Sequence, residues 1–187
     1  MTGVVLTTPR VIIRPWREED RQPFAQMSQD PAVMRYFPNH LSLEQSHAMV
    51  DKMQQLIEEN GWGFWALERQ SDGAFMGLAG LHRQNSSFPN GPLVEIGWRL
   101  AQEFWHQGYA QEAAQAILTF AFERLKLAEV YAFTALCNAP SRQLMTRLGM
   151  KNCESDFDHP KLPVDHPLCR HCLYRISDLQ WQQNKGR

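Results

Sequence analysis

A strand, a glycine-containing turn and an alanine-rich helix follow one another between residues 93 and 125, and this stretch constrains the fold more than any other. The run LVEIGWRL (Leu93–Leu100) is typical of a strand. Apolar residues then recur at three- and four-residue steps from Ala110 to Leu125, which predicts an amphipathic helix that begins near Gly108. Alanines on its apolar face let this helix lie close to a sheet. The stretch therefore predicts a helix that packs on a sheet.

The turn at Gly108 has a second property, because the first turn of a helix is suited to hold an anion. Its first N–H groups have no partner within the helix, and the helix dipole adds roughly half a positive charge there. Glycine has no Cβ that would keep an anion away, and His106 and Gln107 could add donors. A tight turn that simply needs glycine is the alternative. The dinucleotide and nucleoside-triphosphate fingerprints G-x-G-x-x-G and Gly-Lys-Ser/Thr are absent from the sequence.

The remaining elements predict a single α+β domain over residues 1–187. We expect strands at 10–16, on both sides of the turn QSDG (70–73), at 93–100, 129–136 and 171–177, with helices at 17–28, 41–61, 108–125 and 139–148. Ser42 and Gln45 have the spacing of a capping box, and Gly61 is a stop signal for the same helix. This mixed order favours a sheet with helices on both faces.

Composition limits the partners and the location. The formal net charge is -1 over 187 residues, which argues against a general nucleic-acid or membrane surface. No run approaches the roughly 18–20 apolar residues of a membrane-spanning helix, and the first residues do not resemble a secretory signal. We therefore expect a cytoplasmic protein whose four cysteines are reduced.

A second group of polar residues follows the strand predicted at 129–136. Asn138 can cap the next helix, Pro140 suits its first turn, and Ser141 lies three residues after Asn138. These residues follow the carboxyl end of a strand, where open sheets place ligands. The alternative is that Asn138 only caps the helix and Ser141 only contacts water.

Six motifs in order resemble the GNAT superfamily of acetyl-CoA-dependent N-acetyltransferases. The similarity is greatest to the branch that contains the ribosomal-protein N-terminal alanine acetyltransferases, and it covers about Thr8 to Lys151. The motifs are TPRVIIRPWREED, DPAVMRYF, GFWAL with GAFMGLAGL, VEIGWRL, EFWHQGYAQEA and NAPSRQLMTRLGM. The resemblance implies a mixed, mostly antiparallel, twisted sheet whose central strands splay apart.

The same resemblance assigns residues to the acetyl-CoA donor. The family's phosphate loop, Arg/Gln-x-x-Gly-x-Gly/Ala, corresponds here to a loop that begins with tryptophan, as is usual in this branch. Its residues are Trp105, His106, Gln107, Gly108, Tyr109 and Ala110. Their backbone N–H groups would hold the pyrophosphate, the backbone of Trp98, Arg99 and Leu100 would pair with the acyl-pantetheine arm, and Asn138 would also contact the donor.

Direct transfer to an amine needs a base for the amine and a proton for the departing thiolate. Glu95 is the candidate base, because a carboxylate in an apolar strand has a raised pKa. A glutamate on a solvated strand face is the alternative. Ser141 is the candidate proton donor, since the tyrosine that many family members carry further along this helix is absent here.

The segment Asp156–Tyr174 is rich in histidine and cysteine. These are zinc ligands, but the spacing does not fit a zinc finger, so we expect no metal. We expect this loop to wall the acceptor site, with Asp158, His159 or His166 near the incoming amine.

The acceptor is expected to be a protein N-terminal α-amine. Roughly a tenth of such amines is neutral at pH 7, whereas a lysine side chain is neutral less than about one time in a thousand, so a weak base suffices for the first. A small-molecule amine and a non-catalytic acyl-CoA-binding module of the same fold are the alternatives. A homodimer is compatible with the sequence.

Overall fold

A computed structural model describes residues 3–186, which form two compact units. The first unit comprises the residues up to Leu81 together with Gly97–Ile117. The second comprises His82–Ile96 and the residues from Leu118 onwards. Strands β4 (Phe75–Gln84) and β5 (Leu93–Leu100) and helix α3 (Tyr109–Thr119) each contribute residues to both units.

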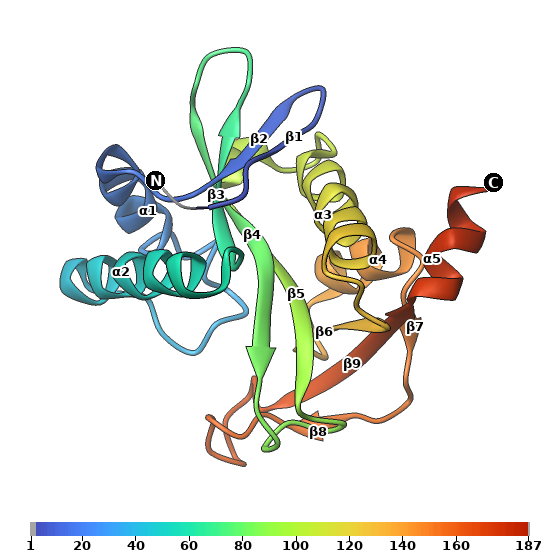
Figure 1. The fold of residues 1–187 in the computed structure, drawn as a ribbon. Helices are drawn as coiled ribbons and strands as arrows, with labels where there is room; N and C mark the ends of the chain where they lie inside the picture. The colour runs from blue at the N-terminus through green and yellow to red at the C-terminus, as the bar shows by residue number, and fades with distance from the viewer. Residues whose placement is uncertain (1–2, 187) are drawn as a thin grey trace. The chain divides into compact units, whose positions relative to one another are not determined.

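The sheet of the first unit is an antiparallel meander (Figure 1). Its strands follow the order β1 (Leu6–Thr7), β2 (Val11–Arg14), β3 (Phe64–Arg69) and the first part of β4. Ile13 of β2 lies opposite Leu67 of β3, and both side chains are fully buried. The turn QSDG joins β3 to β4, as its sequence predicts, and Arg69 N donates to Ala74 O at 2.8 Å.

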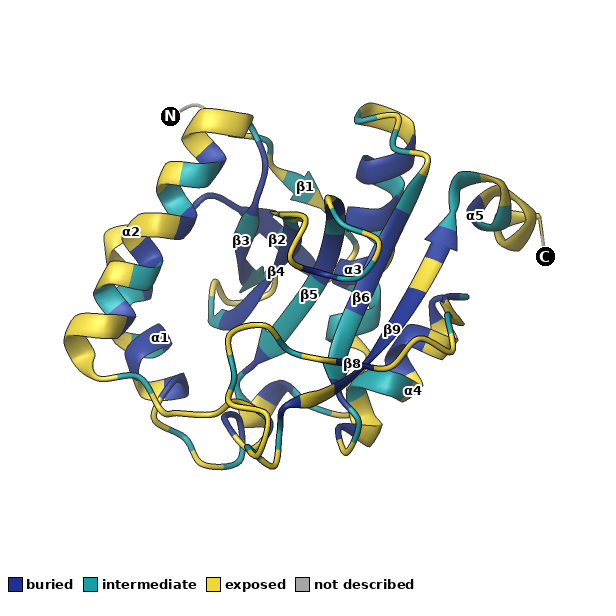
Figure 2. Ribbon diagram, turned by 90° about the horizontal axis from the view of Figure 1, so that it is seen from below, coloured by how far each residue is buried: buried dark blue, intermediate teal, exposed yellow. Residues whose placement is uncertain are grey.

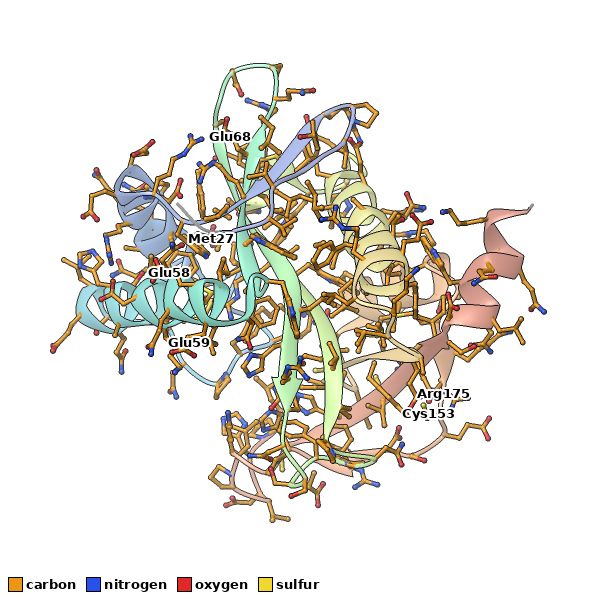
Figure 3. All side chains as sticks on the ribbon, viewed as in Figure 1. Met27, Glu58, Glu59, Glu68, Cys153 and Arg175 are labelled. Carbon is orange, nitrogen blue, oxygen red and sulfur yellow. The ribbon has the colours of Figure 1, made fainter. Side chains whose placement is uncertain are left out.

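Of two helices in this unit, α2 (Leu43–Asn60) begins and ends where local sequence signals place it, whereas α1 (Arg21–Met27) begins four residues later than expected. A short 3-10 turn (Glu18–Asp20) leads into α1. Ser42 and Gln45 form the expected capping box, and Gly61 ends α2 with a left-handed φ of 79°. The inner side of α2 buries Val50, Met53 and Ile57, whereas its outer side carries the exposed Glu58 and Glu59 (Figures 2 and 3).

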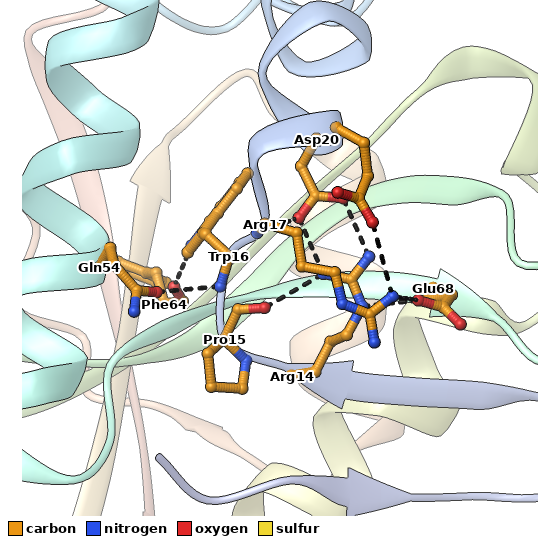
Figure 4. Close-up of polar contacts among 9 residues, drawn as sticks. Arg14, Pro15, Trp16, Arg17, Asp20, Gln54, Phe64 and Glu68 are labelled. Carbon is orange, nitrogen blue, oxygen red and sulfur yellow. Dashed lines mark hydrogen bonds and ion pairs between the residues drawn. The ribbon is translucent and has the colours of Figure 1, made fainter. Parts of the chain in front are cut away.

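A buried ion-pair cluster fixes the start of α1 to the sheet of this unit (Figure 4). Arg14 donates from Nη1 and Nη2 to the two carboxylate oxygens of Asp20 at 2.8 and 2.9 Å, and from Nε to Glu68 at 2.6 Å. Trp16 donates its indole N–H to Phe64 O at 2.9 Å. The buried Arg14 thus has a carboxylate partner on each side, which is how proteins usually accommodate a buried charge.

The sheet of the second unit is built around one long antiparallel pair. Strand β6 (Glu129–Ala135) pairs with β9 (Arg170–Ser177) from Glu129 opposite Ser177 to Ala135 opposite His171. Two short strands, β7 (Lys151–Asn152) and β8 (Phe157–Asp158), also pair with β9. Strand β5 runs parallel to β6, with Glu95 opposite Tyr131.

Helix α3 begins one residue after Gly108 and buries its alanine face. Ala113, Ala114, Ile117 and Leu118 are all fully buried. The helix continues into a π-helical segment (Phe120–Arg124), in which Leu125 N donates to Phe120 O at 3.1 Å. The predicted helix over 108–125 is therefore present, with a wider final turn.

The end of the chain differs from the expectation of a terminal strand. Helix α5 (Asp178–Lys185) follows β9 and begins with a capping box made by Ser177 and Gln180. Its buried Trp181 lies against Phe122, with ring centroids 6.0 Å apart. Strands β1 and β8, of two residues each, were also not predicted. Such short strands exist because a longer neighbour supplies their hydrogen bonds.

The predicted fold class is confirmed. The pairs β1/β2, β2/β3, β3/β4, β6/β9, β7/β9 and β8/β9 are antiparallel, and β5/β6 is parallel. The described residues add five α-helices to this mostly antiparallel sheet structure. Across residues 3–186, no helix combines the length and the apolar character that crossing a bilayer requires.

Candidate active site

The turn that leads into α3 has an unusual backbone conformation. His106 and Gly108 both have left-handed φ angles, of 58° and 81°. Trp105 donates its indole N–H to Leu100 O at 2.9 Å, and Gln107 donates its amide to Glu103 O at 2.8 Å. Glu112 N donates to Gly108 O at 3.0 Å, which closes the first turn of the helix. The left-handed backbone therefore favours glycine at position 108, where a Cβ would also lie 3.3 Å from Nη2 of Arg10.

Arg10, which the sequence analysis did not single out, holds this turn in place. Its Nη1 donates to Gln107 O at 2.9 Å and its Nε forms an ion pair with Glu112 at 2.7 Å. Its guanidinium also lies 4.5 Å from the ring centre of Tyr109. Thr8 donates to the same carboxylate at 2.7 Å. The chain segment before β2 thus braces the first turn of α3 through the ion pair of Arg10 with Glu112.

The end of β5 lies against β4 with very little space between the backbones. A Cβ on Gly77 would come within 2.2 Å of Arg99 O, and Ala101 N donates to Met76 O at 2.9 Å. Leu100 O already accepts from Trp105. The predicted donor residues Trp98, Arg99 and Leu100 therefore belong to the same unit as the turn Trp105–Ala110, and one of their carbonyls is used internally.

Glu95 lies in the second unit, in a largely apolar environment. Its exposed fraction is 9%, so the alternative of a solvated strand face is wrong. Gln84 donates its amide to the carboxylate at 2.8 Å. Burial raises the pKa of Glu95 to about 7, although the Gln84 hydrogen bond and the charge of Lys161 both act to lower it. A carboxyl group with this pKa exchanges its proton near neutral pH, as a general base must.

Aromatic side chains and two histidines extend this environment in the second unit. The buried cluster contains Phe88, Leu93, Tyr131, Phe157 and Leu173, with Phe133 packed against it. The rings of His159 and His171 lie 4.9 Å apart, and His159 is 5.4 Å from Phe88. Burial is the main reason that the pKa of His159 falls to about 4, and burial also lowers the pKa of His171 from its ordinary value. The loop after β8 thus brings the charge of Lys161 close enough to lower the pKa of Glu95, and it brings His159 against Phe88.

Asn138 and Ser141 lie together at the start of α4 (Ala139–Arg147). Asn138 Oδ1 accepts from Ser141 N at 3.3 Å, and its amide donates to Ser141 Oγ at 3.1 Å and to Thr134 at 2.9 Å. The predicted cap is therefore confirmed, and it fixes the Ser141 side chain. This pair belongs to the second unit, as Glu95 does.

The histidines and cysteines of the segment 156–174 do not gather into a metal site. Within residues 3–186, no group of three or more His, Cys, Asp and Glu side chains is placed to hold a metal ion. His171 Nδ1 lies 3.0 Å from Cys169 O, and His159 Nδ1 accepts from Lys161 N at 3.2 Å. Cys137, Cys153, Cys169 and Cys172 are free thiols.

Comparison with known proteins identifies the family to which the chain belongs. The family model described as an acetyltransferase (GNAT) domain matches residues 10–151. The N-acetyltransferase YnaD of Bacillus subtilis is 28% identical over 177 residues, which cover 94% of this chain and 98% of YnaD. The FsC-acetyl coenzyme A-N(2)-transacetylase of Aspergillus fumigatus is 29% identical over 95% of this chain and 79% of its own. Relatives along most of the chain are thus named as enzymes that transfer acetyl groups to nitrogen.

Solved structures agree on the fold. A GNAT acetyltransferase from Bacillus anthracis superposes with a TM-score of 0.79 at 24% identity, covering 94% of this chain and 99% of that one. RimL, a ribosomal L7/L12 α-N-protein acetyltransferase solved in complex with coenzyme A, gives a TM-score of 0.74 at 15% identity over 93% and 98% of the two chains. With the family model matching three quarters of its length, the chain belongs to the GNAT family and is an acetyl-CoA-dependent acetyltransferase.

Proposed function

We propose that this enzyme transfers the acetyl group of acetyl-CoA to the α-amino group of a protein N-terminus, with Glu95 as the general base. The observation that carries this proposal is the pKa of Glu95, which burial raises to about 7. An α-amino group has a pKa of about 7.7–8.0 and a lysine side chain one of about 10.4. Proton transfer to Glu95 is therefore nearly balanced for an α-amine and strongly uphill for a lysine.

For the donor, we propose that the backbone of the turn Trp105–Ala110 holds the pyrophosphate. The left-handed Gly108 keeps side-chain atoms away from the N–H groups at the start of α3. Arg10 holds this turn by donating to Gln107 O, while its charge is paired with Glu112. The backbone of Trp98–Leu100 is proposed to pair with the pantetheine arm, and Asn138 to contact the donor from the start of α4.

The chemical step that we propose is a single displacement on the thioester. The amine nitrogen attacks the carbonyl carbon, so that a C–N bond forms and the C–S bond breaks. Glu95 takes the proton that the amine loses, directly or through one water molecule. The leaving thiolate takes a proton from the Ser141 hydroxyl, which regains one from solvent. A backbone N–H of β5 supplies the hydrogen bond that the developing oxyanion needs.

A small-molecule amine is the second candidate acceptor. It is favoured by the similarity to the FsC-acetyl coenzyme A-N(2)-transacetylase, whose name describes acetyl transfer at a nitrogen designated N(2). The two acceptor classes differ in size and in what surrounds the amine, so an acceptor screen separates them.

The test is to mix enzyme, acetyl-CoA and single acceptors, and to measure the free thiol of CoA as it appears. N-terminal peptides that begin with different residues form one set, and polyamines, amino sugars and free amino acids form the other. Peptide acetylation at the N-terminal nitrogen, shown by mass spectrometry, supports the proposal. Transfer to small amines alone, or to lysine side chains within N-terminally blocked peptides, would contradict it.

We also propose that the two units act as one catalytic domain. The family match over residues 10–151 draws on both units, and two strands and one helix run through both. A cytoplasmic location is proposed for an enzyme with four free thiols.

A further inference from the structure

Two of the three guanidinium nitrogens of Arg99 are buried without a hydrogen-bond partner among the described residues. Among residues 3–186, its Nε and Nη1 find no hydrogen-bond partner, and both atoms are shielded from solvent. The residue as a whole keeps partial exposure, so the shielding is not complete. Burial lowers the pKa of Arg99 to about 10, which leaves it charged at neutral pH. Arg99 is therefore a partly exposed cation whose Nε and Nη1 are buried, and no charged side chain among residues 3–186 perturbs its pKa.

Arg14, in the same unit, shows how this chain treats a buried arginine that serves structure alone. Arg14 donates to Asp20 and to Glu68 and leaves no buried nitrogen without a partner (Figure 4). A structural arginine is thus provided with carboxylates of the chain itself. A buried guanidinium without such partners is strongly unfavourable unless an external group satisfies it. The contrast indicates that the partner of Arg99 comes from outside the chain.

An aromatic ring covers the guanidinium from one side. Phe37 lies with its ring centre 4.0 Å from Cζ of Arg99, a distance at which the ring face attracts a cation. Phe37 is itself 37% exposed, which is unusual for a phenylalanine. It belongs to the segment between α1 and α2, which is tied at its ends by Met34 N to Asp30 O at 2.9 Å and Leu41 N to Ser28 O at 3.1 Å. An exposed ring on a loop can move aside without disturbing the core.

The phosphates of acetyl-CoA are not the expected partner. The proposed phosphate turn, Trp105–Ala110, offers backbone N–H groups for the phosphates and is braced by Arg10, which pairs with Glu112. In Figure 1 the segment that carries Phe37 runs beneath α2, whereas the turn that enters α3 lies behind β2. The pantetheine arm, which is proposed to meet the backbone of this strand, is uncharged. The remaining molecule that the reaction brings to β5 is the acceptor.

We propose that Arg99 is a specificity residue that binds a carboxylate of the acceptor, beneath the ring of Phe37. This inference rests on the proposed function, since it names a property of the same acceptor. Guanidinium groups prefer planar oxyanions such as carboxylates, to which they form charge-assisted hydrogen bonds. The acceptor class is then an amine that also carries a carboxylate, such as an N-terminal peptide with an acidic residue near its start.

The test compares acceptors that differ only in one charge. Peptides in which one early residue is Asp or Glu are paired with the same peptides containing Asn or Gln, and kcat/KM is measured for each member. Wild-type enzyme should prefer the acid by about 10–100-fold, the usual value of a hydrogen bond to a charged group. Arg99→Met should reduce this ratio to about one, and Arg99→Lys should retain part of it. Phe37→Ala should alter the ratio without abolishing it, because the guanidinium remains.

Two further measurements separate the possible failures. If wild-type enzyme acetylates acidic and amide peptides equally well, the inference about Arg99 is overturned while the proposed function stands. If Arg99→Met weakens acetyl-CoA binding in calorimetry and leaves the acid preference intact, the guanidinium serves the donor and the inference is also overturned. If no peptide is acetylated, calorimetric titration of the CoA-bound enzyme with each peptide pair still shows whether Arg99 favours the acidic peptide. Preferential binding of the acid, lost in Arg99→Met, would support the inference, and equal binding would overturn it.

Discussion

Replacing Glu95 by glutamine should slow acetyl transfer and, at the same time, stabilise the fold at neutral and alkaline pH. Glutamine has nearly the same shape as glutamate, and its side-chain oxygen can still accept the hydrogen bond that Gln84 donates at 2.8 Å. The change therefore removes the ionisable group and leaves the packing in place. The two expected effects have opposite signs, and a residue with a structural role alone would not produce both.

The stability effect follows from the pKa of Glu95, which burial raises from 4.5 in the unfolded chain to about 7. Between these two values the native state binds more protons than the unfolded state, so wild-type stability falls as pH rises through this window. Above pH 7 the full effect is roughly 3 kcal/mol, because one pKa unit corresponds to about 1.4 kcal/mol. Below pH 4.5 the carboxyl is protonated in both states and has no such effect. Glu95→Gln should thus be more stable than wild type at pH 8 by up to about 3 kcal/mol, and equally stable near pH 4.

The effect on the rate depends on the pH as well. A positioned base contributes about 10²–10⁴-fold, and for an α-amine that is already roughly one-tenth neutral at pH 7 we expect the low end, about 10–100-fold. In wild type, kcat/KM should rise with pH and level off near pH 7, where Glu95 has lost its proton. In the variant it should continue to rise until the amine itself is neutral, near pH 8 for an α-amine. The ratio of the two rates is therefore constant at low pH and decreases above pH 7.

The assay is a pH–rate profile of kcat/KM for both enzymes, together with urea unfolding at pH 4.5 and pH 8. Glu59→Gln is the matched control, because Glu59 is an exposed carboxylate on α2 that accepts from Gln55 (Figure 3). It should change neither the profile nor the pH dependence of stability. Identical profiles for Glu95→Gln and wild type would refute the assignment of the base, and equal stability at pH 8 would refute the effect of burial.

Three further changes test the donor turn, the proton donor and the electrostatics around the base. Gly108→Ala should lose about 1–2 kcal/mol of stability, because alanine is strained at a φ of 81°. The control Gly73→Ala, at a φ of 74° with no atom near its Cβ, should lose a similar amount of stability. Only Gly108→Ala should also weaken acetyl-CoA binding in calorimetry. Ser141→Ala should slow single-turnover transfer by about 10–100-fold, and an unchanged rate with a lowered melting temperature would leave Ser141 with a purely structural role. Lys161→Gln should shift the acidic limb of the profile to higher pH, because the charge of Lys161 lowers the pKa of Glu95; a shift to lower pH would contradict this.

Gly108 also shows where a local rule was insufficient. The sequence predicts that a helix begins near Gly108, and α3 does begin at Tyr109. The backbone at Gly108 is left-handed, however, and not helical. A bulkier residue such as valine is therefore opposed by backbone strain as well as by the ligand, and a stability control is needed in any such experiment.

The sequence determined the features that depend on neighbours along the chain. The capping box of Ser42, the stop at Gly61, the hairpin at QSDG and the cap at Asn138 each involve residues within a few positions of one another. Side-chain hydrogen bonds to the backbone and the φ preferences of glycine and asparagine act at this range. The family's motifs are of the same kind and pointed to the candidate donor turn, whereas Glu95 was proposed from its position in an apolar strand.

Helix α5 was missed although its capping signal, Ser177 with Gln180, is present in the sequence. Its segment is polar and buries one large side chain, Trp181, so it has hardly any apolar periodicity. Without that periodicity, a local cap does not distinguish a helix from a turn. The contact of Trp181 with Phe122, from far earlier in the chain, supplies what the local pattern lacks.

Only the tertiary structure decided the charges and the burial around the candidate site. The ion pair of Arg10 with Glu112 joins residues about a hundred positions apart, and Phe37 covers Arg99 from a distant loop. The same is true of Glu95, whose pKa reflects the side chains that exclude water from it. Desolvation and Coulomb interactions depend on distance in space and on the absence of water. A sequence specifies which groups can ionise, and the packing of distant segments determines at what pH they do so.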